Sequence, residues 1–245
     1  GVGCLKSFFF SFFLSEASAA GERALPNILF ILADDLGYGD VGCYNPESKV
    51  PTPNLDRLAR QGMRFTDAHA GSTVCTPSRY AILTGRMTFR IPYRGVFVGV
   101  GGPCLIEKER LTLPQMLREH GYATALVGKW HLGLTFFDKQ GRRVTDPGIN
   151  GVRRVDFSRR IPDAPIHRGF DYFFGTACCP TTDWLYAWIV GDRIPVPPTH
   201  LLDKSNLPKH PYSHDNRRGM IAPNYDLETV DLVFLEKSKK WLEKH

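Results

Sequence analysis

The sequence has no cysteine or histidine spacing typical of a zinc site, no internal repeat, and no apolar run long enough to cross a bilayer. It also lacks a strong charge of either sign, since the formal net charge over 245 residues is only +6. The basic residues are scattered or occur in short pairs, and no stripe interleaves them with aromatic residues. We therefore expect no zinc centre, no stable membrane insertion and no nucleic-acid partner.

The bulk composition is that of a folded domain with a sizeable core. Apolar residues make up 42% of the chain, aromatic residues 12% and charged residues 23%, which are ordinary proportions. A length of 245 residues suits one large domain or two small ones. The mildly basic balance is compatible with an anionic substrate.

The N-terminal residues have the pattern of an export signal. Lys6 precedes an apolar run at 8–14, and small residues follow at 17–20. A positive charge, a short apolar stretch and an A-x-A-like site are typical of a secretory signal peptide. We interpret 1–20 as this signal and 21–245 as the exported chain, with a periplasmic, secreted or lumenal destination. Because the sequence begins with glycine rather than methionine, we expect the natural start to lie upstream.

The six cysteines leave the disulfide pattern open. Export would place them in an oxidising compartment. Cys4 would leave with the signal peptide, and Cys75 stands in a chemical motif. The remaining four allow three pairings: Cys43, Cys104, Cys178 and Cys179.

The order of the expected elements predicts an α/β fold. A continuous apolar run at 27–33, ending at two aspartates, is typical of a parallel strand buried on both faces. Capping residues and glycine stops predict helices, and apolar runs predict further strands. We expect helices at 54–61, 77–84, 113–120 and 226–244, strands at 63–68 and 122–127, a hairpin at 183–195 with a Gly191-Asp192 turn, and a surface excursion at 134–165. Alternating strands and helices favour a mostly parallel central sheet sandwiched by helices.

The segment around Cys75 has the residues of an oxyanion site. Cys75 lies just before a helix that Pro77 would start, where the positive end of the helix dipole lowers a thiol pKa and stabilises anions. Arg79 follows one helical turn later, on the same side. From the spacing alone, a structural cysteine beside a surface arginine is the simpler interpretation.

Four segments together resemble the sulfatase family. Residues 75–86 read C-T-P-S-R-Y-A-I-L-T-G-R, which is similar to the first family signature, C-x-P-S-R followed by a short helix ending in T-G. Residues 121–133 read G-Y-A-T-A-L-V-G-K-W-H-L-G and match the second signature without a break. Residues 26–39 resemble the first family strand and its Asp-Asp turn. Residues 167–175, H-R-G-F-D-Y-F-F-G, resemble the block H-G-F-D-x-F-x-G with Arg168 inserted.

The resemblance implies an alkaline-phosphatase-like α/β fold and hydrolysis of sulfate esters to an alcohol or phenol and sulfate. It implies that Cys75 is oxidised to formylglycine by a formylglycine-generating enzyme, and that the hydrated aldehyde attacks sulfur. By the same resemblance Arg79 holds the hydrate, Lys129 contacts sulfate oxygens, and His131 assists release of sulfate. Lys129 and His131 would face the same way if their segment is extended.

The resemblance also implies a calcium site. Asp34 and Asp35 end the first expected strand, at the edge where α/β sheets bind ligands, and their hard oxygens suit calcium. The residue formed at Cys75 would complete this part of the ligand set. A looser correspondence suggests a polar substrate contact from Thr181, Thr182 or Asp183.

The chain departs from the family pattern toward its C-terminus. Sulfatases continue with a second histidine, a second lysine and an Asp-Asn metal pair, and no motif here matches these. We interpret Asp215-Asn216 as loop residues, because no buried strand precedes them. The chain is therefore expected to be an N-terminal fragment that is inactive by itself. Two alternatives remain: a phosphate or phosphonate ester hydrolase of the same superfamily, and a non-catalytic binding homologue.

Overall fold

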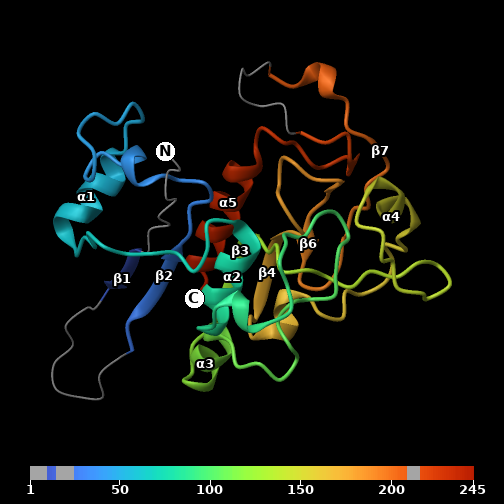
Figure 1. Cartoon of the computed structure of the whole chain (residues 1–245), viewed down its shortest axis with the longest axis horizontal. Helices are drawn as coiled ribbons and strands as arrows, with labels where there is room; N and C mark the ends of the chain where they lie inside the picture. The colour runs from blue at the N-terminus through green and yellow to red at the C-terminus, as the bar shows by residue number, and fades with distance from the viewer. Residues whose placement is uncertain (1–9, 15–24, 209–215) are drawn as a thin grey trace. The chain divides into compact units, whose positions relative to one another are not determined.

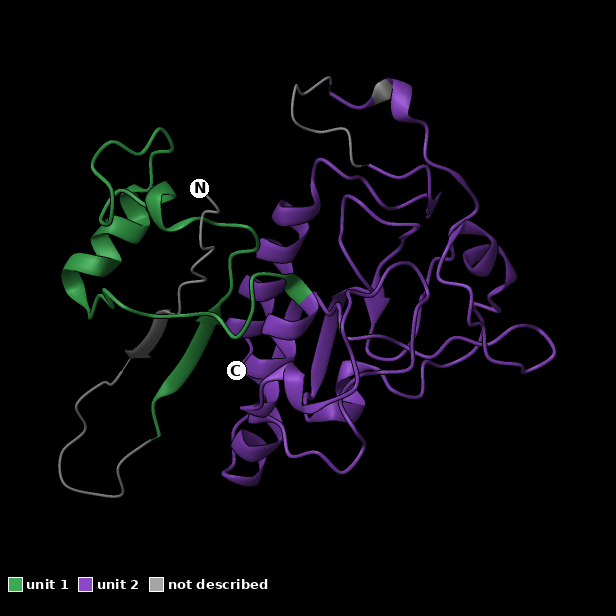
Figure 2. Ribbon diagram, in the orientation of Figure 1, with its two compact units in different colours: residues 1–75 green, residues 76–245 purple. Residues whose placement is uncertain are grey.

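The structure, a computed structural model, describes residues 10–14, 25–208 and 216–245. The described chain divides into two compact units, residues up to Cys75 and residues from Thr76 onward (Figure 2). Each unit contains both strands and helices, so the α/β fold class is confirmed (Figure 1). Residues 1–9 and 15–24, which hold most of the expected signal peptide, lie outside the described residues.

The unit that ends at Cys75 contains the first expected strand, with a different environment from the one predicted. Strand β2 (Asn27–Ile31) pairs antiparallel with β1 (Phe10–Leu14). All five residues of β2 are exposed, so the prediction of a strand buried on both faces was wrong. Burial on both faces requires covering layers as well as an apolar sequence, and the apolar run alone predicts only the strand.

Helix α1 (Pro53–Gln61) forms as its end signals predict. Pro53 occupies the first helical position, where its fixed φ suits the helix and its missing N–H costs nothing. The N–H of Gly62 bonds to the carbonyl of Leu58 at 2.9 Å and ends the helix. Residues 63–68 contain no strand, so that prediction was wrong. The unit also contains the 3-10 turn η1 (Tyr38–Asp40).

The unit from Thr76 onward contains two three-stranded sheets. In one, β3 (Ala125–Lys129) runs parallel to β4 (Tyr172–Thr176), and β4 pairs antiparallel with β6 (Ile189–Val190). In the other, β8 (Met220–Ile221) lies parallel to β5 (Leu185–Tyr186) and antiparallel to β7 (His200–Leu201). The hairpin predicted at 183–195 forms only next to its turn, where Val190 and Arg193 make an isolated antiparallel bridge, while β5 and β6 pair with other strands. Its turn does form, with Gly191 at φ +60°.

Helix α5 (Val230–Leu242) covers the sheet that contains β3 and β4, as Figure 1 shows. Alternate residues of β4 point to one face of the sheet. There the ring of Tyr172 stacks on Trp241, with centroids 5.1 Å apart. The ammonium of Lys237 lies 5.2 Å from the ring centroid of Phe174. The predicted C-terminal helix thus packs its aromatic and aliphatic side on the sheet.

Helix α3 (Leu113–Glu119) has the cap that the sequence predicts. The hydroxyl of Thr112 accepts the N–H of Gln115 at 3.3 Å. Gly121 follows the helix at φ +85°, a conformation that favours glycine. The chain then enters β3, so the strand predicted at 122–127 begins and ends later than expected.

The segment 134–165 was predicted to be a surface excursion, and this was wrong for its apolar residues. It contains α4 (Ile149–Arg154) and packs against the core. The large apolar side chains that it buries are Leu134, Phe136, Val144, Val152, Val155 and Ile161. The polar composition of the segment comes from the exposed side chains between these buried residues. The remaining short elements are η2 (Thr88–Arg90), η3 (Pro165–Arg168) and η4 (Lys204–Asn206).

Candidate active site

Helix α2 (Cys75–Thr84) begins two residues earlier than predicted, so Cys75 is its first residue. Arg79 lies one turn further along the same helix. Its guanidinium Nη1 donates to the carbonyl of Lys129 at 2.5 Å. The helix therefore presents Cys75 at its positive end and attaches to the end of β3 through Arg79.

The second signature segment leaves β3 and turns sharply. Lys129 is the last residue of the strand and is buried, with 8% of its surface exposed. The N–H of His131 donates to Ala177 at 2.9 Å, which continues the pairing beside β4. His131 nevertheless has φ +59° and is 2% exposed. The expectation that Lys129 and His131 share a face of an extended segment was therefore wrong, because a left-handed residue breaks the alternation.

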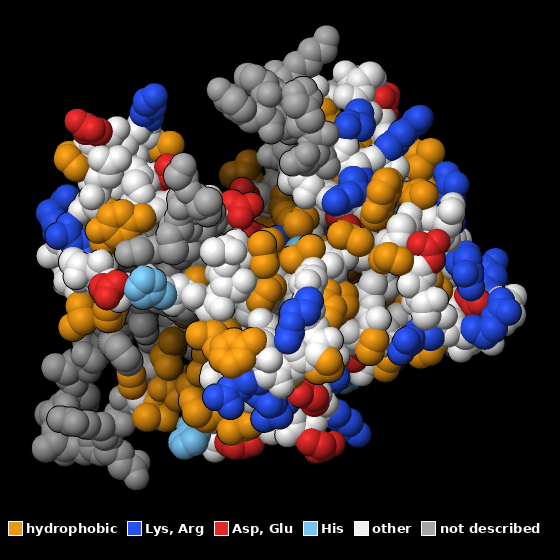
Figure 3. All heavy atoms as spheres, viewed as in Figure 1, with side chains coloured by type: hydrophobic (Ala, Val, Ile, Leu, Met, Phe, Trp, Pro, Cys, Tyr) orange, Lys and Arg blue, Asp and Glu red, His pale blue; other side chains and the backbone are white. Residues whose placement is uncertain are grey.

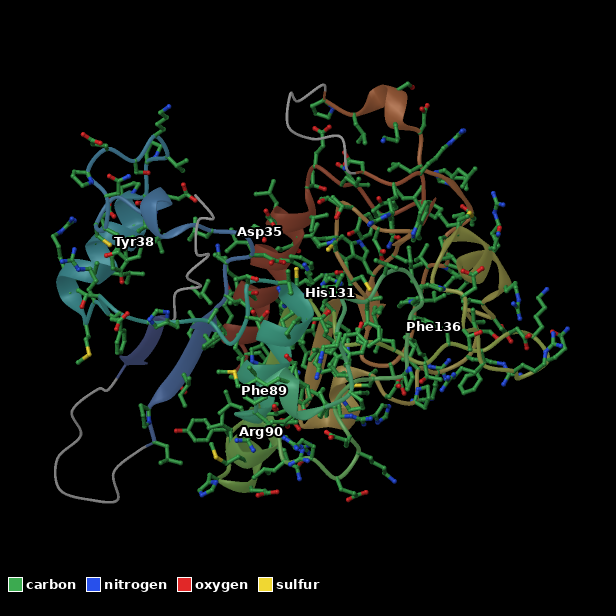
Figure 4. The ribbon with its side chains drawn as sticks, viewed as in Figure 1. Asp35, Tyr38, Phe89, Arg90, His131 and Phe136 are labelled. Atoms are coloured by element: carbon green, nitrogen blue, oxygen red, sulfur yellow. The ribbon has the colours of Figure 1, made fainter. Side chains whose placement is uncertain are left out.

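The imidazole of His131, which is labelled in Figure 4, is held by one short contact. Its Nε2 lies 2.6 Å from the carbonyl oxygen of Phe97. A carbonyl can only accept, so Nε2 carries the proton. The buried Nδ1 has no hydrogen-bond partner among the described residues. The ring is thereby held with Nδ1 as the atom available to accept a proton.

Thr76 joins the two signature segments. Its buried hydroxyl donates to the carbonyl of His131 at 2.7 Å and accepts the N–H of Phe97 at 3.4 Å. Together with the Arg79 contact, this gives α2 two hydrogen bonds to the end of β3 and the residues that follow it. The sequence identified neither Thr76 nor Phe97, because Thr76 occupies a variable position of its signature and Phe97 contributes only its backbone.

Asp183 holds the loop that contains Phe97 and Gly99. Its Oδ1 accepts the N–H of Gly99 at 2.7 Å, and its Oδ2 has no hydrogen-bond partner within the described chain. The side chain is 1% exposed, and this burial raises the pKa of Asp183 from 3.8 to about 6. Because its side chain is almost fully buried, Asp183 is less suited to the substrate contact considered for it than Thr181 or Thr182.

The loop between β4 and β5 is pinned by side-chain donors to its carbonyl oxygens. The amide of Asn216 donates to Thr181 at 2.7 Å, and the guanidinium of Arg217 donates to Thr182. Thr181 and Thr182 are partly exposed and remain candidates for a substrate contact. Asn216 thus binds protein backbone, which agrees with its interpretation as a loop residue, whereas Asp215 lies outside the described residues.

Burial suppresses the reactivity of two cysteines away from the signature, Cys104 and Cys178. Burial raises the pKa of Cys104 to about 12 and that of Cys178 well above its ordinary value. Both are free thiols, as is Cys43. A low thiolate fraction makes Cys104 and Cys178 poor nucleophiles, whereas Cys75 is partly exposed and is the first residue of a helix.

The two aspartates of the expected calcium site lie in a turn after β2. Asp34 and Asp35 are exposed, and Asp35 has φ +59° (Figure 4). Consecutive carboxylates in a tight turn supply the hard oxygen donors that calcium prefers. No group of three or more His, Cys, Asp or Glu side chains that could hold a metal occurs in the part of the chain described. The donors present fit part of a calcium shell, which takes six to eight oxygens.

Among the described residues, no helix has the length and apolar character needed to cross a membrane. β1 covers part of the apolar N-terminal run that was interpreted as a signal peptide.

Comparison with known proteins identifies the family. The Sulfatase family model matches residues 26–193. Human steryl-sulfatase is 40% identical over 174 residues, human arylsulfatase A is 47% identical over 127, and the N-acetylgalactosamine-6-O-sulfatase of Bacteroides thetaiotaomicron is 44% identical over 149. These matches cover 69%, 51% and 61% of this chain.

The same relatives are much longer than this chain, which spans 26%, 24% and 26% of their respective lengths. A solved sulfatase structure, from work on glycosaminoglycan metabolism by Bacteroides thetaiotaomicron, superposes with a TM-score of 0.66 at 28% identity. That match covers 86% of this chain and 46% of the solved one. The family match extends over more than half of the sequence and includes both signature segments, so the chain belongs to the sulfatase family.

Proposed function

We propose that this chain supplies the nucleophile side of an active site that hydrolyses sulfate esters to an alcohol or phenol and sulfate. The observation that carries the proposal is the joining of the two signature segments by hydrogen bonds. Arg79 reaches the carbonyl of Lys129 at 2.5 Å, and Thr76 reaches that of His131 at 2.7 Å. The helix N-terminus, the guanidinium of Arg79, the ammonium of Lys129 and the imidazole of His131 are the groups that we propose to form one oxyanion site.

Cys75 is proposed to act as formylglycine, installed by a formylglycine-generating enzyme. When hydrated, that aldehyde supplies two hydroxyls on one carbon, one to attack sulfur and one to lose its proton as sulfate leaves. Arg79 stabilises the negative charge that develops at residue 75. Lys129 binds a sulfate oxygen as a point charge. His131 accepts the proton of the second hydroxyl at Nδ1, since its Nε2 is committed to Phe97.

Calcium is the proposed metal, with Asp34, Asp35 and residue 75 as the ligands from this chain. When bound, it would polarise the nucleophile and neutralise charge on the sulfate group. We also propose that residues 1–20 are a cleaved export signal, and that 21–245 form the N-terminal part of the catalytic domain. The relatives include aryl, steryl and amino-sugar sulfatases, so the alcohol released is left general.

Peptide mass spectrometry of the protein purified from its natural host tests the nucleophile. The peptide containing residue 75 is expected to carry an aldehyde in place of the thiol. The natural-length protein is expected to hydrolyse an aryl sulfate and to lose that activity in Cys75→Ala. An unmodified thiol with no turnover would favour a binding protein. Faster hydrolysis of the matching phosphate ester would favour the phosphatase alternative.

A further inference from the structure

The segment containing α4 carries an unusual share of the positive charge. Residues 138–160 contain seven Lys and Arg against three Asp, a surplus of four, whereas the whole chain has a net charge of +6. With Arg193 from the turn after β6, eight exposed cations form what we name the basic surface: Lys139, Arg142, Arg143, Arg153, Arg154, Arg159, Arg160 and Arg193. Figure 3 shows several Lys and Arg side chains at the right of the view, beside the place of α4 in Figure 1.

Ion pairs and hydrogen bonds hold the segments of the basic surface together. The carboxylate of Asp138 pairs with Arg142 at 3.0 Å and with Arg154 at 3.6 Å, which joins the bend at 138–143 to α4. The guanidinium of Arg193 donates to the carbonyl of Ser158 at 3.2 Å, which joins the turn after β6 to the loop after α4. The cations therefore belong to one packed region and not to independent loops.

The acidic residues of this region form ion pairs with only half of the cations of the basic surface. Asp138, Asp156 and Asp192 pair with arginines, and Asp138 and Asp192 are themselves buried. Four cations have no ion pair within the described chain: Lys139, Arg143, Arg153 and Arg193. Exposed cations repel one another, and this repulsion weakens the fold slightly when no acidic residue neutralises them. Their grouping therefore favours binding of an anionic partner.

The chemistry of the surface indicates what that partner is. Seven of its eight cations are arginines, whose planar fork of donors matches oxyanion groups such as sulfate. None of the exposed large hydrophobic side chains falls between residues 138 and 160. Single-stranded nucleic acids are bound by aromatic side chains that stack on the bases, and anionic membranes are bound with inserted apolar side chains. The basic surface offers neither kind of side chain.

We propose that the basic surface binds a sulfated polysaccharide, which docks a polymeric substrate of the sulfatase. This inference rests on the proposed function for the role of the polymer, but the binding itself does not require turnover. Several cations spread over one face suit a chain with repeated sulfate groups better than a single sulfate ester. The basic surface contains none of the residues assigned to the reaction.

Binding of a fluorescent, highly sulfated heparin-type oligosaccharide tests the proposal by anisotropy at several salt concentrations. The test variant combines Lys139→Gln, Arg143→Gln and Arg153→Gln, because these side chains make no hydrogen bond or ion pair within the described chain and their removal spares the fold. We expect roughly tenfold weaker binding. The slope of log affinity against log salt should fall by about two, since each anionic group that a cation neutralises contributes about 0.7–0.9 to that slope.

The matched control removes three cations from the C-terminal end of α5 and the residues after it by Lys239→Gln, Lys240→Gln and Lys244→Gln. We expect it to retain most of the affinity. Equal losses in both variants would show attraction by net charge alone and overturn the proposal. So would equally tight binding of single-stranded DNA, of anionic vesicles or of the desulfated oligosaccharide. Hydrolysis of a small aryl sulfate by the natural-length test variant should be unchanged, so failure of catalysis is distinguishable from failure of docking.

Discussion

The buried carboxyl of Asp183 makes the stability of this chain depend on pH in an unusual direction. One of its oxygens accepts the N–H of Gly99 at 2.7 Å, and the other is buried without a hydrogen-bond partner in the described part of the molecule. Burial raises the pKa of Asp183 to about 6 from 3.8. The folded state therefore binds this proton more tightly than the unfolded state does.

The sign follows from the two pKa values of Asp183. Its stabilising contribution is fully present below about pH 4, where both states are protonated, and it declines as the pH rises toward 6. Above the folded pKa the contribution is gone and the stability levels off. Raising the pKa from 3.8 to about 6 corresponds to about 3 kcal/mol.

The informative variant is Asp183→Asn. The asparagine oxygen can still accept the N–H of Gly99, and the amide nitrogen replaces the carboxyl oxygen that has no partner within the described chain. An unsatisfied buried donor costs about 1–3 kcal/mol, but this cost does not vary with pH. The difference in unfolding free energy between variant and wild type should therefore shift by about 2 kcal/mol in favour of the variant between about pH 4.5 and pH 7.

Urea unfolding followed by circular dichroism at both pH values measures this shift. Glu109→Gln, which removes an exposed carboxylate that makes no hydrogen bond within the described chain, controls for the loss of one negative charge. A difference between Asp183→Asn and wild type that is the same at both pH values would refute the reasoning. That result would mean that folding does not raise the pKa of Asp183.

Three further predictions concern the same loop and helix. Gly99→Ala should destabilise the fold by at least about 1–3 kcal/mol in urea unfolding, because φ is +55° and a Cβ would lie 2.0 Å from the carbonyl oxygen of Pro147; unchanged stability would contradict the close approach. Thr76→Val should cost about 1–2 kcal/mol, since it removes the hydroxyl bound to His131, whereas Thr76→Ser should cost less. Arg79→Lys should lower kcat of the natural-length protein on an aryl sulfate roughly a hundredfold, because the fork that holds the Lys129 carbonyl is lost; full activity with lysine would remove Arg79 from the proposed site.

Helices and turns were predictable where the residues that start or end them are adjacent in the sequence. Thr112 and Gly121 predicted the bounds of α3 to within one residue, and the turn at Gly191 was predicted from its dipeptide. Strand β2 was predicted from its apolar run, but its exposure was not. An apolar run reports the tendency to leave water, whereas burial depends on which layers cover the strand.

Some residues of the candidate site were predicted from the sequence, and others were identified only from the structure. The family signatures pointed to Cys75, Arg79, Lys129 and His131, and the structure joins the helix of the first pair to the segment of the second. The support from Phe97 and Asp183 was missed. Their partners lie 34 and 84 residues away in sequence, and Phe97 acts only through its carbonyl. The glycine-rich run at 99–102 was the available signal for a close backbone approach.

The sequence by itself determined the α/β class, the sulfatase signatures and the residue types able to attack, bind and move protons. Only the tertiary structure decided the start of α2 at Cys75, the left-handed turn at His131, the tautomer set by Phe97 and the burial of Asp183. The physical reason is that propensity, caps and motifs act between neighbours along the chain. Burial, ring orientation and shifted pKa values depend on groups that only folding brings together.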